Sequence, residues 1–163
     1  MKLVLIECVV LCILFAAVVM TIATHTNPLT WVYNYPPYVV KRCEELHLIE
    51  PRTVNKKTVY TKKLIFCVLV GILFGLVMRY VNQITEFLPA ALTTYLIWLV
   101  VDWFDFLVLD SLWFMNNKSL TIPGTEDLPY PNGTYAFHAM ASLRGMLLGV
   151  IFAVVAGIVV ILL

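Results

Sequence analysis

The sequence predicts an all-α, polytopic membrane protein with four transmembrane helices in a bundle, and three observations support this prediction. Hydrophobic residues make up 61% of the 163 residues and charged residues only 13%, whereas soluble chains are roughly half apolar and a quarter charged. The apolar residues gather in four runs, each close to or above the roughly 20 residues that span a bilayer. None of these runs shows the alternation with period two that is typical of barrel strands.

The helices are expected in chain order, and together they form a single integral membrane domain over residues 1–163. The first run is expected to remain as a helix, because no convincing signal-peptidase site follows it. The expected helices cover about residues 3–23, 64–81, 89–115 and 143–163.

Charge sets the expected orientation and excludes one class of partner. Eleven basic and ten acidic residues give a net charge of +1, so the strong basic excess of a nucleic-acid-binding protein is missing. Nine of the eleven Lys and Arg residues lie in or beside the segments 24–63 and 116–142. The positive-inside rule therefore predicts that both loops are cytoplasmic and that both termini lie outside the cytoplasm of a cell membrane.

The long loop 24–63 contains a candidate short helix. Residues 38–49 have an amphipathic pattern that Pro51 would end. This helix would be either a surface anchor or partner-docking element, or a connector packed under the bundle, and we favour the connector. In the second loop, Asn117 and Asn132 begin glycosylation sequons. Glycans are not added in the cytoplasm, so either these matches are accidental or the orientation is inverted.

Small residues predict where helices pack closely. Glycine or alanine recurs every fourth position in the last helix, and the second helix has a G-x-x-x-G pattern. Such stripes let two backbones approach in lipid. The partner is either another helix of the chain or a second copy, and a homo-oligomer or a larger membrane complex is favoured. The helix-packing candidates are Gly71, Gly75, Gly145, Gly149, Ala153 and Gly157.

Charged residues inside the apolar runs are expensive and mark candidate functional positions. Glu7 and Arg79 fall at similar depth when the helices are laid out antiparallel, so an ion pair between them is geometrically allowed. Arg144, at the start of the last helix, is a candidate partner for Asp110. These three groups, Glu7, Arg79 and Arg144, are the ion-pair candidates.

The third helix holds three aspartates, and they are the main candidate site. At 100° per residue, Asp102, Asp105 and Asp110 share one broad face, with Asp102 in the centre near the middle of the membrane. No basic residue is expected at the depth of Asp102 and Asp105. Carboxyl groups placed there would face water, bind a cation, or stay protonated and hydrogen-bond to neighbouring hydroxyl or carbonyl groups.

Other polar groups are expected to gather at the cytoplasmic end. The segment 116–142 is rich in turn residues and longer than a simple hairpin needs. Its acidic residues and two histidines near the helix ends would form a polar mouth beside Asp110, although a histidine at a helix start is more often structural. The mouth candidates are His25, Glu126, Asp127 and His138.

These patterns lead to three hypotheses about function. The first is a transporter or channel that handles a proton, a cation or a small solute through Asp102, Asp105 and Asp110. The second is a membrane-embedded enzyme acting on a lipid or polyprenyl headgroup, in which Asp105, Asp110 and His138 would use a divalent cation. The third is an accessory subunit in which the aspartates hold helices together. The sequence by itself requires no cofactor.

Overall fold

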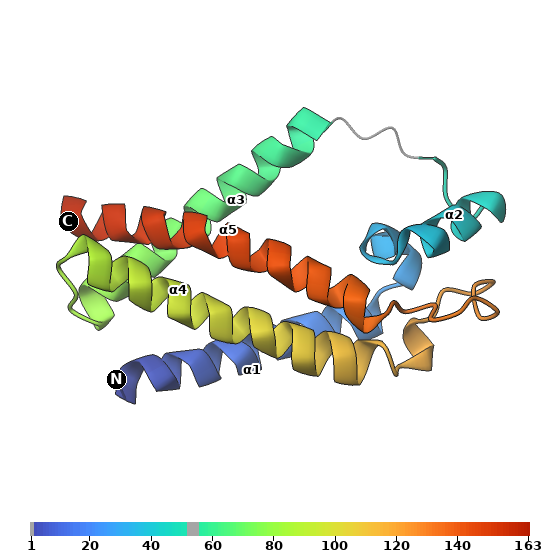
Figure 1. Cartoon of the computed structure of the whole chain (residues 1–163), viewed down its shortest axis with the longest axis horizontal. Coiled ribbons are helices and arrows are strands. Elements are labelled where there is room, and N and C mark those ends of the chain that lie inside the picture. Colours follow the sequence, from blue (N-terminus) through green and yellow to red (C-terminus); the bar gives the residue numbers. More distant parts are fainter. Residues whose placement is uncertain (1, 52–55) are drawn as a thin grey trace. The chain divides into compact units, whose positions relative to one another are not determined.

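The computed structural model describes residues 2–51 and 56–163, and over these residues it is an all-α structure. Of these described residues 79% are helical, and none of them lies in a strand. Four helices are long and apolar enough to cross a membrane, which confirms the number of spans expected from the sequence. They comprise Lys2–His25, Lys57–Val81, Phe87–Phe114 and Tyr135–Leu162 (Figure 1). These helices fit a multi-pass membrane protein.

Two of the four helices begin earlier than the hydropathy predicts. Helix α3 covers Lys56–Leu76 instead of beginning near residue 64, and α5 covers Tyr135–Leu162 instead of beginning near 143. A hydropathy profile detects only the apolar part of a helix. Lysine has a high helix propensity, so a helix can continue through polar residues that the profile does not detect. The start of α5 is fixed by a cap, because the Phe137 backbone N–H donates to the Thr134 hydroxyl at 3.2 Å.

The second and third spans both end in π-helical segments. Helix α3 continues as η2 (Val77–Val81), and α4 (Phe87–Phe104) continues as η3 (Asp105–Phe114). A π-helix closes each hydrogen bond five residues along instead of four. The rotation of 100° per residue used to place the three aspartates on one face therefore does not apply beyond Asp105, and their common face stays a prediction.

Short helices occupy the two long loops. After α1 (Lys2–His25) the chain forms η1 (Pro28–Asn34), whose first turn is capped by Asn27, and then α2 (Pro37–Glu45). Helix α2 is the short helix expected at 38–49, although it ends at Glu45. The second loop contains η4 (Lys118–Leu120).

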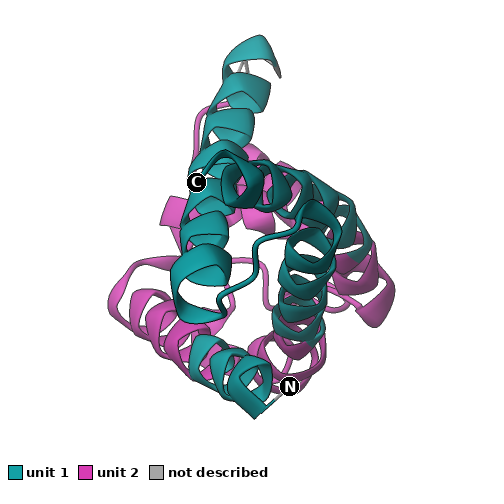
Figure 2. Cartoon of the chain, turned by 90° about the vertical axis from the view of Figure 1, so that its left-hand side faces the viewer, with its two compact units in different colours: residues 1–12, 54–103, 143–163 teal, residues 13–53, 104–142 magenta. Residues whose placement is uncertain are grey.

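The chain divides into two compact units, each assembled from segments that are distant in sequence (Figure 2). Unit 1 comprises residues 1–12, 54–103 and 143–163, and unit 2 comprises residues 13–53 and 104–142. The two units are described separately below.

In unit 1 the glycines of the small-residue stripes contact helices of the same chain. A Cβ built on Gly71 or Gly75 of α3 would lie 2.6 Å from the Cβ of Val155 or Val159 of α5. On α5, each glycine faces α4, and Ala153 is also buried. The α5–α4 contacts are Gly145 with Asp102, Gly149 with Trp98, and Gly157 with Phe87. Close packing within one chain therefore accounts for these stripes, and they give no support to an oligomer.

Unit 2 has a small hydrophobic core that joins the two loops. Val39 and Cys43 of α2 are fully buried, and they pack in one cluster with Tyr35 and with Ile122 of the second loop. The Tyr35 hydroxyl donates to the Leu120 carbonyl at 2.5 Å. Burial, with a smaller contribution from Cys43, raises the pKa of Tyr35 to about 12. Within this unit α2 packs against the second loop, and its role as a connector under the bundle stays a prediction.

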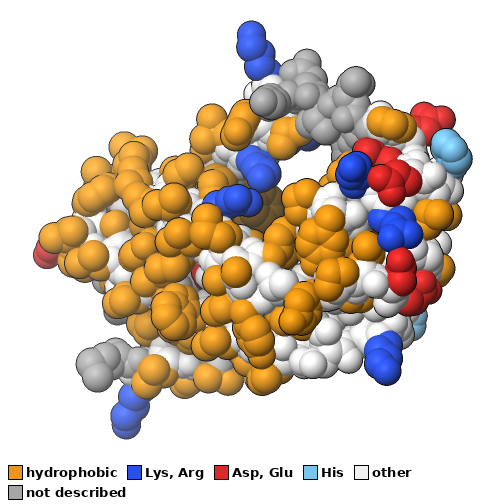
Figure 3. All heavy atoms as spheres, turned by 45° about the vertical axis from the view of Figure 1, so that its right-hand side comes forward, with side chains coloured by type: hydrophobic (Ala, Val, Ile, Leu, Met, Phe, Trp, Pro, Cys, Tyr) orange, Lys and Arg blue, Asp and Glu red, His pale blue; other side chains and the backbone are white. Residues whose placement is uncertain are grey.

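Large apolar side chains cover much of the surface. Leu69, Leu147 and Leu162 are more than half exposed, and many Val, Ile and Phe side chains of the spans are also exposed. Figure 3 shows hydrophobic side chains over much of the face it draws. Exposure on this scale is unusual for a soluble protein and is expected where lipid covers the protein.

Candidate functional site: a buried histidine–aspartate pair

A polar site in unit 2 connects the end of the third span to the start of α5. Oδ2 of Asp110, in η3, lies 3.1 Å from Nδ1 of His138, in the first turn of α5. His138 is only 4% exposed, while the Asp110 side chain keeps 27% of its surface exposed. The histidine is therefore enclosed by protein, and the carboxyl group connects it to the exterior.

Both ring nitrogens of His138 face oxygen atoms that accept hydrogen bonds. Nε2 lies 3.0 Å from the backbone carbonyl oxygen of Asn132. Because a carbonyl oxygen only accepts, Nε2 carries a proton in this geometry. The hydrogen bond between Nδ1 and Asp110 then needs one further proton, on either the ring or the carboxyl group. The pair thus holds one shared proton and is neutral as a whole, which lowers the cost of burying it.

A tight turn places the Asn132 carbonyl against the histidine ring. Gly133 has a φ of +100°, a conformation that L side chains rarely adopt. A Cβ at Gly133 would also lie only 2.6 Å from Nε2 of His138. Thr134 then caps α5 and sets the position of His138 one turn into the helix. The N-G-T sequence is therefore a turn and a helix cap.

The side chain of Asn132 holds this turn in place. It is 4% exposed, and its amide nitrogen donates to the carbonyls of Phe114 and Asn117 at 3.1 and 2.9 Å. Its amide oxygen accepts from the Thr121 hydroxyl at 3.1 Å. In the folded protein this sequon asparagine is thus occupied by internal hydrogen bonds. The Asn117 side chain caps η4 through the Ser119 backbone N–H.

Two aromatic rings contact the His138 member of the pair. Phe114 and Phe137 meet the His138 ring edge-to-face, with ring centroids 5.8 and 5.2 Å apart. These rings keep water from the imidazole and strengthen the hydrogen bonds that it makes.

The other residues of the expected polar mouth do not join the pair. Asp127 pairs with Arg42 of α2 at 3.0 Å, and Glu126 accepts from the Gly124 backbone N–H at 2.8 Å. His25 is exposed at the last residue of α1. Of the predicted group, unit 2 brings together only Asp110 and His138, because Glu126 bonds within its own loop and Asp127 pairs with α2 of the first loop.

The remaining aspartates of the third span are both half-buried. In unit 1, the carboxyl group of Asp102 lies against α5 at Gly145, where any side chain larger than hydrogen would clash with Oδ1. One turn before Asp102, Nε1 of Trp98 donates to the Gly145 carbonyl at 2.9 Å. In unit 2, Asp105 is the first residue of η3. The Asp102–Gly145 contact was not expected from the sequence, although both residues had been singled out separately.

The candidate ion pair between Glu7 and Arg79 is not formed in the described residues. Glu7 accepts a hydrogen bond from the Asn82 side chain at 2.8 Å, and Arg79 donates to the Leu163 carbonyl at 3.3 Å. The similar depth of Glu7 and Arg79 made an ion pair possible but did not make it form. The side-chain amide of Asn82 binds the Glu7 carboxyl group instead. Arg144, the third ion-pair candidate, is exposed.

No metal site is evident in residues 2–51 and 56–163, where no three His, Cys, Asp or Glu side chains converge to hold a metal ion. The divalent-cation site of the enzyme hypothesis stays a prediction. The chain matches no protein-family model, and comparison with curated proteins and with solved structures gives no match either.

Proposed function

We propose that this protein is a small transporter or channel that moves a proton, a cation or a small solute across a membrane through the polar groups of its third span. The observation that carries the proposal is the Asp110–His138 pair. It holds one proton between an imidazole and a carboxyl group, and the Asp110 side chain remains partly exposed. Pairs of this kind are suited to accept and release protons.

The order of carboxyl groups along the helix also favours this function. Asp102 and Asp105 precede Asp110 on one continuous helix, Phe87–Phe114. An aspartate in the middle of an apolar span is costly and in membrane proteins generally marks an ion or proton pathway. In this proposal Asp102 and Asp105 form the polar centre, and Asp110 with His138 forms the cytoplasmic end, with both termini outside.

The proposal is tested by measuring flux in reconstituted vesicles. Wild-type protein should collapse an imposed pH gradient, or a sodium or potassium gradient, faster than empty vesicles, with the membrane potential clamped. Asp102→Asn should abolish this flux while circular dichroism shows an unchanged helical content. His138→Gln should reduce the flux and alter its pH dependence.

The matched control is Glu45→Gln, which makes the same change from carboxylate to amide on an exposed surface pair with Lys41 in α2. Its flux should equal that of the wild type. Wild-type vesicles no leakier than empty ones, for each of the three ions, would contradict an ion-transport function. Unchanged flux in Asp102→Asn would remove this residue from the pathway.

A second candidate function is favoured by the contact between Asp102 and Gly145. A carboxyl group and the Trp98 N–H both placed against one helix backbone also suit a protein whose aspartates hold helices together. This arrangement supports the accessory-subunit hypothesis. Purification in mild detergent of a second protein in fixed stoichiometry, retained by the wild type and lost in Asp102→Asn, would favour it.

A further inference from the structure

The first two turns of α3 form a basic segment in unit 1. Lys57, Lys62 and Lys63 are exposed there, and α3 contains no acidic residue. Lys62 and Lys63 make no ion pair with a carboxyl group of the described residues. By contrast, Lys41 of α2 pairs with Glu45. The charges of Lys62 and Lys63 are therefore available to an anion outside the chain.

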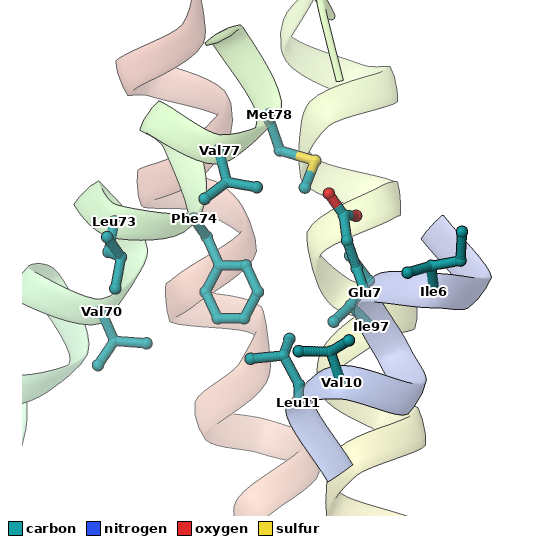
Figure 4. Close-up of a pocket in the computed structure, with 10 residues that line it drawn as sticks. All are labelled: Ile6, Glu7, Val10, Leu11, Val70, Leu73, Phe74, Val77, Met78 and Ile97. Atoms are coloured by element: carbon teal, nitrogen blue, oxygen red, sulfur yellow. The ribbon is translucent and has the colours of Figure 1, made fainter. Parts of the chain in front are cut away.

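The other helices of unit 1 do not cover this segment. Among the described side chains of α3, the first buried one is Cys67. Beyond Cys67 the helix is packed, since Gly71 and Gly75 meet α5, and Phe74 lines an apolar pocket together with residues of α1 and α4 (Figure 4). Before Cys67, α3 projects away from the other helices of unit 1 in both views (Figures 1 and 2). The basic segment is therefore exposed to its surroundings.

The three lysines are distributed around the whole circumference of the helix. At 100° per residue, Lys62 lies about 140° and Lys63 about 240° from Lys57, so neighbouring lysines are about 100–140° apart. A docking face for a soluble protein, or a site for a single headgroup, would gather its charges on one side of the helix. Charges on every side suit instead a continuous anionic surface that surrounds the helix.

The position of the lysines along α3 matches the surface of a bilayer. Directly after Lys63, the apolar side chains of Leu64, Ile65 and Phe66 are 54%, 55% and 60% exposed, as expected where lipid begins. The lysines occupy about 9 Å of helix before these residues, at about 1.5 Å per residue. The headgroup layer on each side of a bilayer is about 5–8 Å thick. Tyr60 is 70% exposed among the lysines, and tyrosine is enriched in this layer.

We propose that Lys57, Lys62 and Lys63 bind the anionic phospholipid headgroups of the membrane surface around α3. Basic residues directly beside a span are attracted to the negative charge of a leaflet. Each ammonium group donates to phosphate or carboxylate oxygens of the headgroups. Because the lysines surround the helix, the attraction depends on the charge of the surface and not on the structure of one headgroup. Phosphatidylserine and phosphatidylglycerol therefore bind about equally well.

The test measures the lipid selectivity of the full chain in phosphatidylcholine vesicles by electron paramagnetic resonance. A trace of spin-labelled lipid reports the fraction held at the protein surface, and comparison of headgroups gives a relative association constant. At low salt the wild type should prefer phosphatidylserine and phosphatidylglycerol to phosphatidylcholine about five-fold, which corresponds to about 1 kcal/mol. The preference should fall towards one at about 1 M salt, where the Debye length is only about 3 Å.

Variants assign the preference to this segment. Changing Lys62→Gln and Lys63→Gln together should reduce it to less than about two-fold. Changing Lys62→Arg and Lys63→Arg together keeps both charges and should retain it. Single changes give a matched comparison, in which Lys63→Gln should lower the preference and Lys41→Gln should not, because the Lys41 ammonium already pairs with Glu45. All these lysines are exposed, so circular dichroism should show an unchanged helical content.

Several results would overturn the proposal. They are equal association of the phosphatidylserine and phosphatidylcholine labels with the wild type, a preference unchanged at high salt or in the double glutamine variant, and an equal loss in Lys41→Gln and Lys63→Gln. A preference for a phosphoinositide without one for phosphatidylglycerol would also contradict it, because that result indicates a site built for one headgroup. If the double glutamine variant does not fold, the salt and headgroup dependence of the wild type decides the question. The proposal does not depend on the transport function, since lipid selectivity is measured without any ion gradient.

Discussion

Replacing Gly149 by alanine tests the contact between α4 and α5. The added Cβ would clash with Cδ1 of Trp98 and lie 2.7 Å from its Nε1. The indole is not free to move away, because Nε1 donates to the Gly145 carbonyl at 2.9 Å and the ring packs edge-on against Phe152 with centroids 4.4 Å apart. Overpacking costs about 1–3 kcal/mol, and a disturbed hydrogen bond adds about 0.5–1.5 kcal/mol.

Alanine also recovers about 1 kcal/mol as a better helix former than glycine. The net expectation for Gly149→Ala is a loss of about 1–3 kcal/mol in the free energy of unfolding, measured by SDS titration in mixed micelles. Val150→Ala is the matched control, since Val150 is 47% exposed on the neighbouring face, and it should change stability by less than about 1 kcal/mol. A Gly149→Ala protein as stable as the wild type, or more stable, would refute the described packing of Trp98.

Two further predictions concern unit 2. Burial raises the pKa of Tyr35 from 10.0 to about 12, so the stability that its neutral phenol provides is present below pH 10 and is lost between about pH 10 and 12. Unfolding measured across that range should show this loss in the wild type and not in Tyr35→Phe, and equal slopes would contradict it. Burial also raises the pKa of the Cys43 thiol above its usual 9.0, so in a variant that keeps only this cysteine, iodoacetamide should react much more slowly with the folded than with the SDS-unfolded protein at pH 8. Equal rates would show that α2 does not bury its cysteine.

The four spans were predictable because a run of about 20 apolar residues is the length that a helix needs to cross the hydrocarbon core of a membrane. The glycine positions were predictable for a related reason, since a small residue every fourth position lies on one side of a helix. What the pattern could not provide was the partner. Gly145 and Asp102 are distant in sequence, and nothing local to either residue indicates that they meet.

The core of unit 2 was beyond local patterns for a different reason. Val39 and Ile122 come from separate loops, and nothing in the local pattern of either loop indicates that the two residues meet. The turn that positions His138 was readable in principle, because asparagine–glycine favours a turn and threonine favours a helix cap. Residues 132–134 also match a glycosylation sequon. We interpreted them only as a sequon, so the turn and the helix cap were not predicted.

The pair of Asp110 and His138 is the central claim of this account, and nitrogen NMR tests it most directly. His138 would be labelled with ¹⁵N in lipid vesicles, with His25 and His47 replaced by glutamine. The account predicts a protonated Nε2 and an Nδ1 that is hydrogen-bonded, with the Nδ1 resonance shifting in Asp110→Asn. An Nε2 without a proton, or an Nδ1 resonance that does not respond to Asp110→Asn, would contradict it.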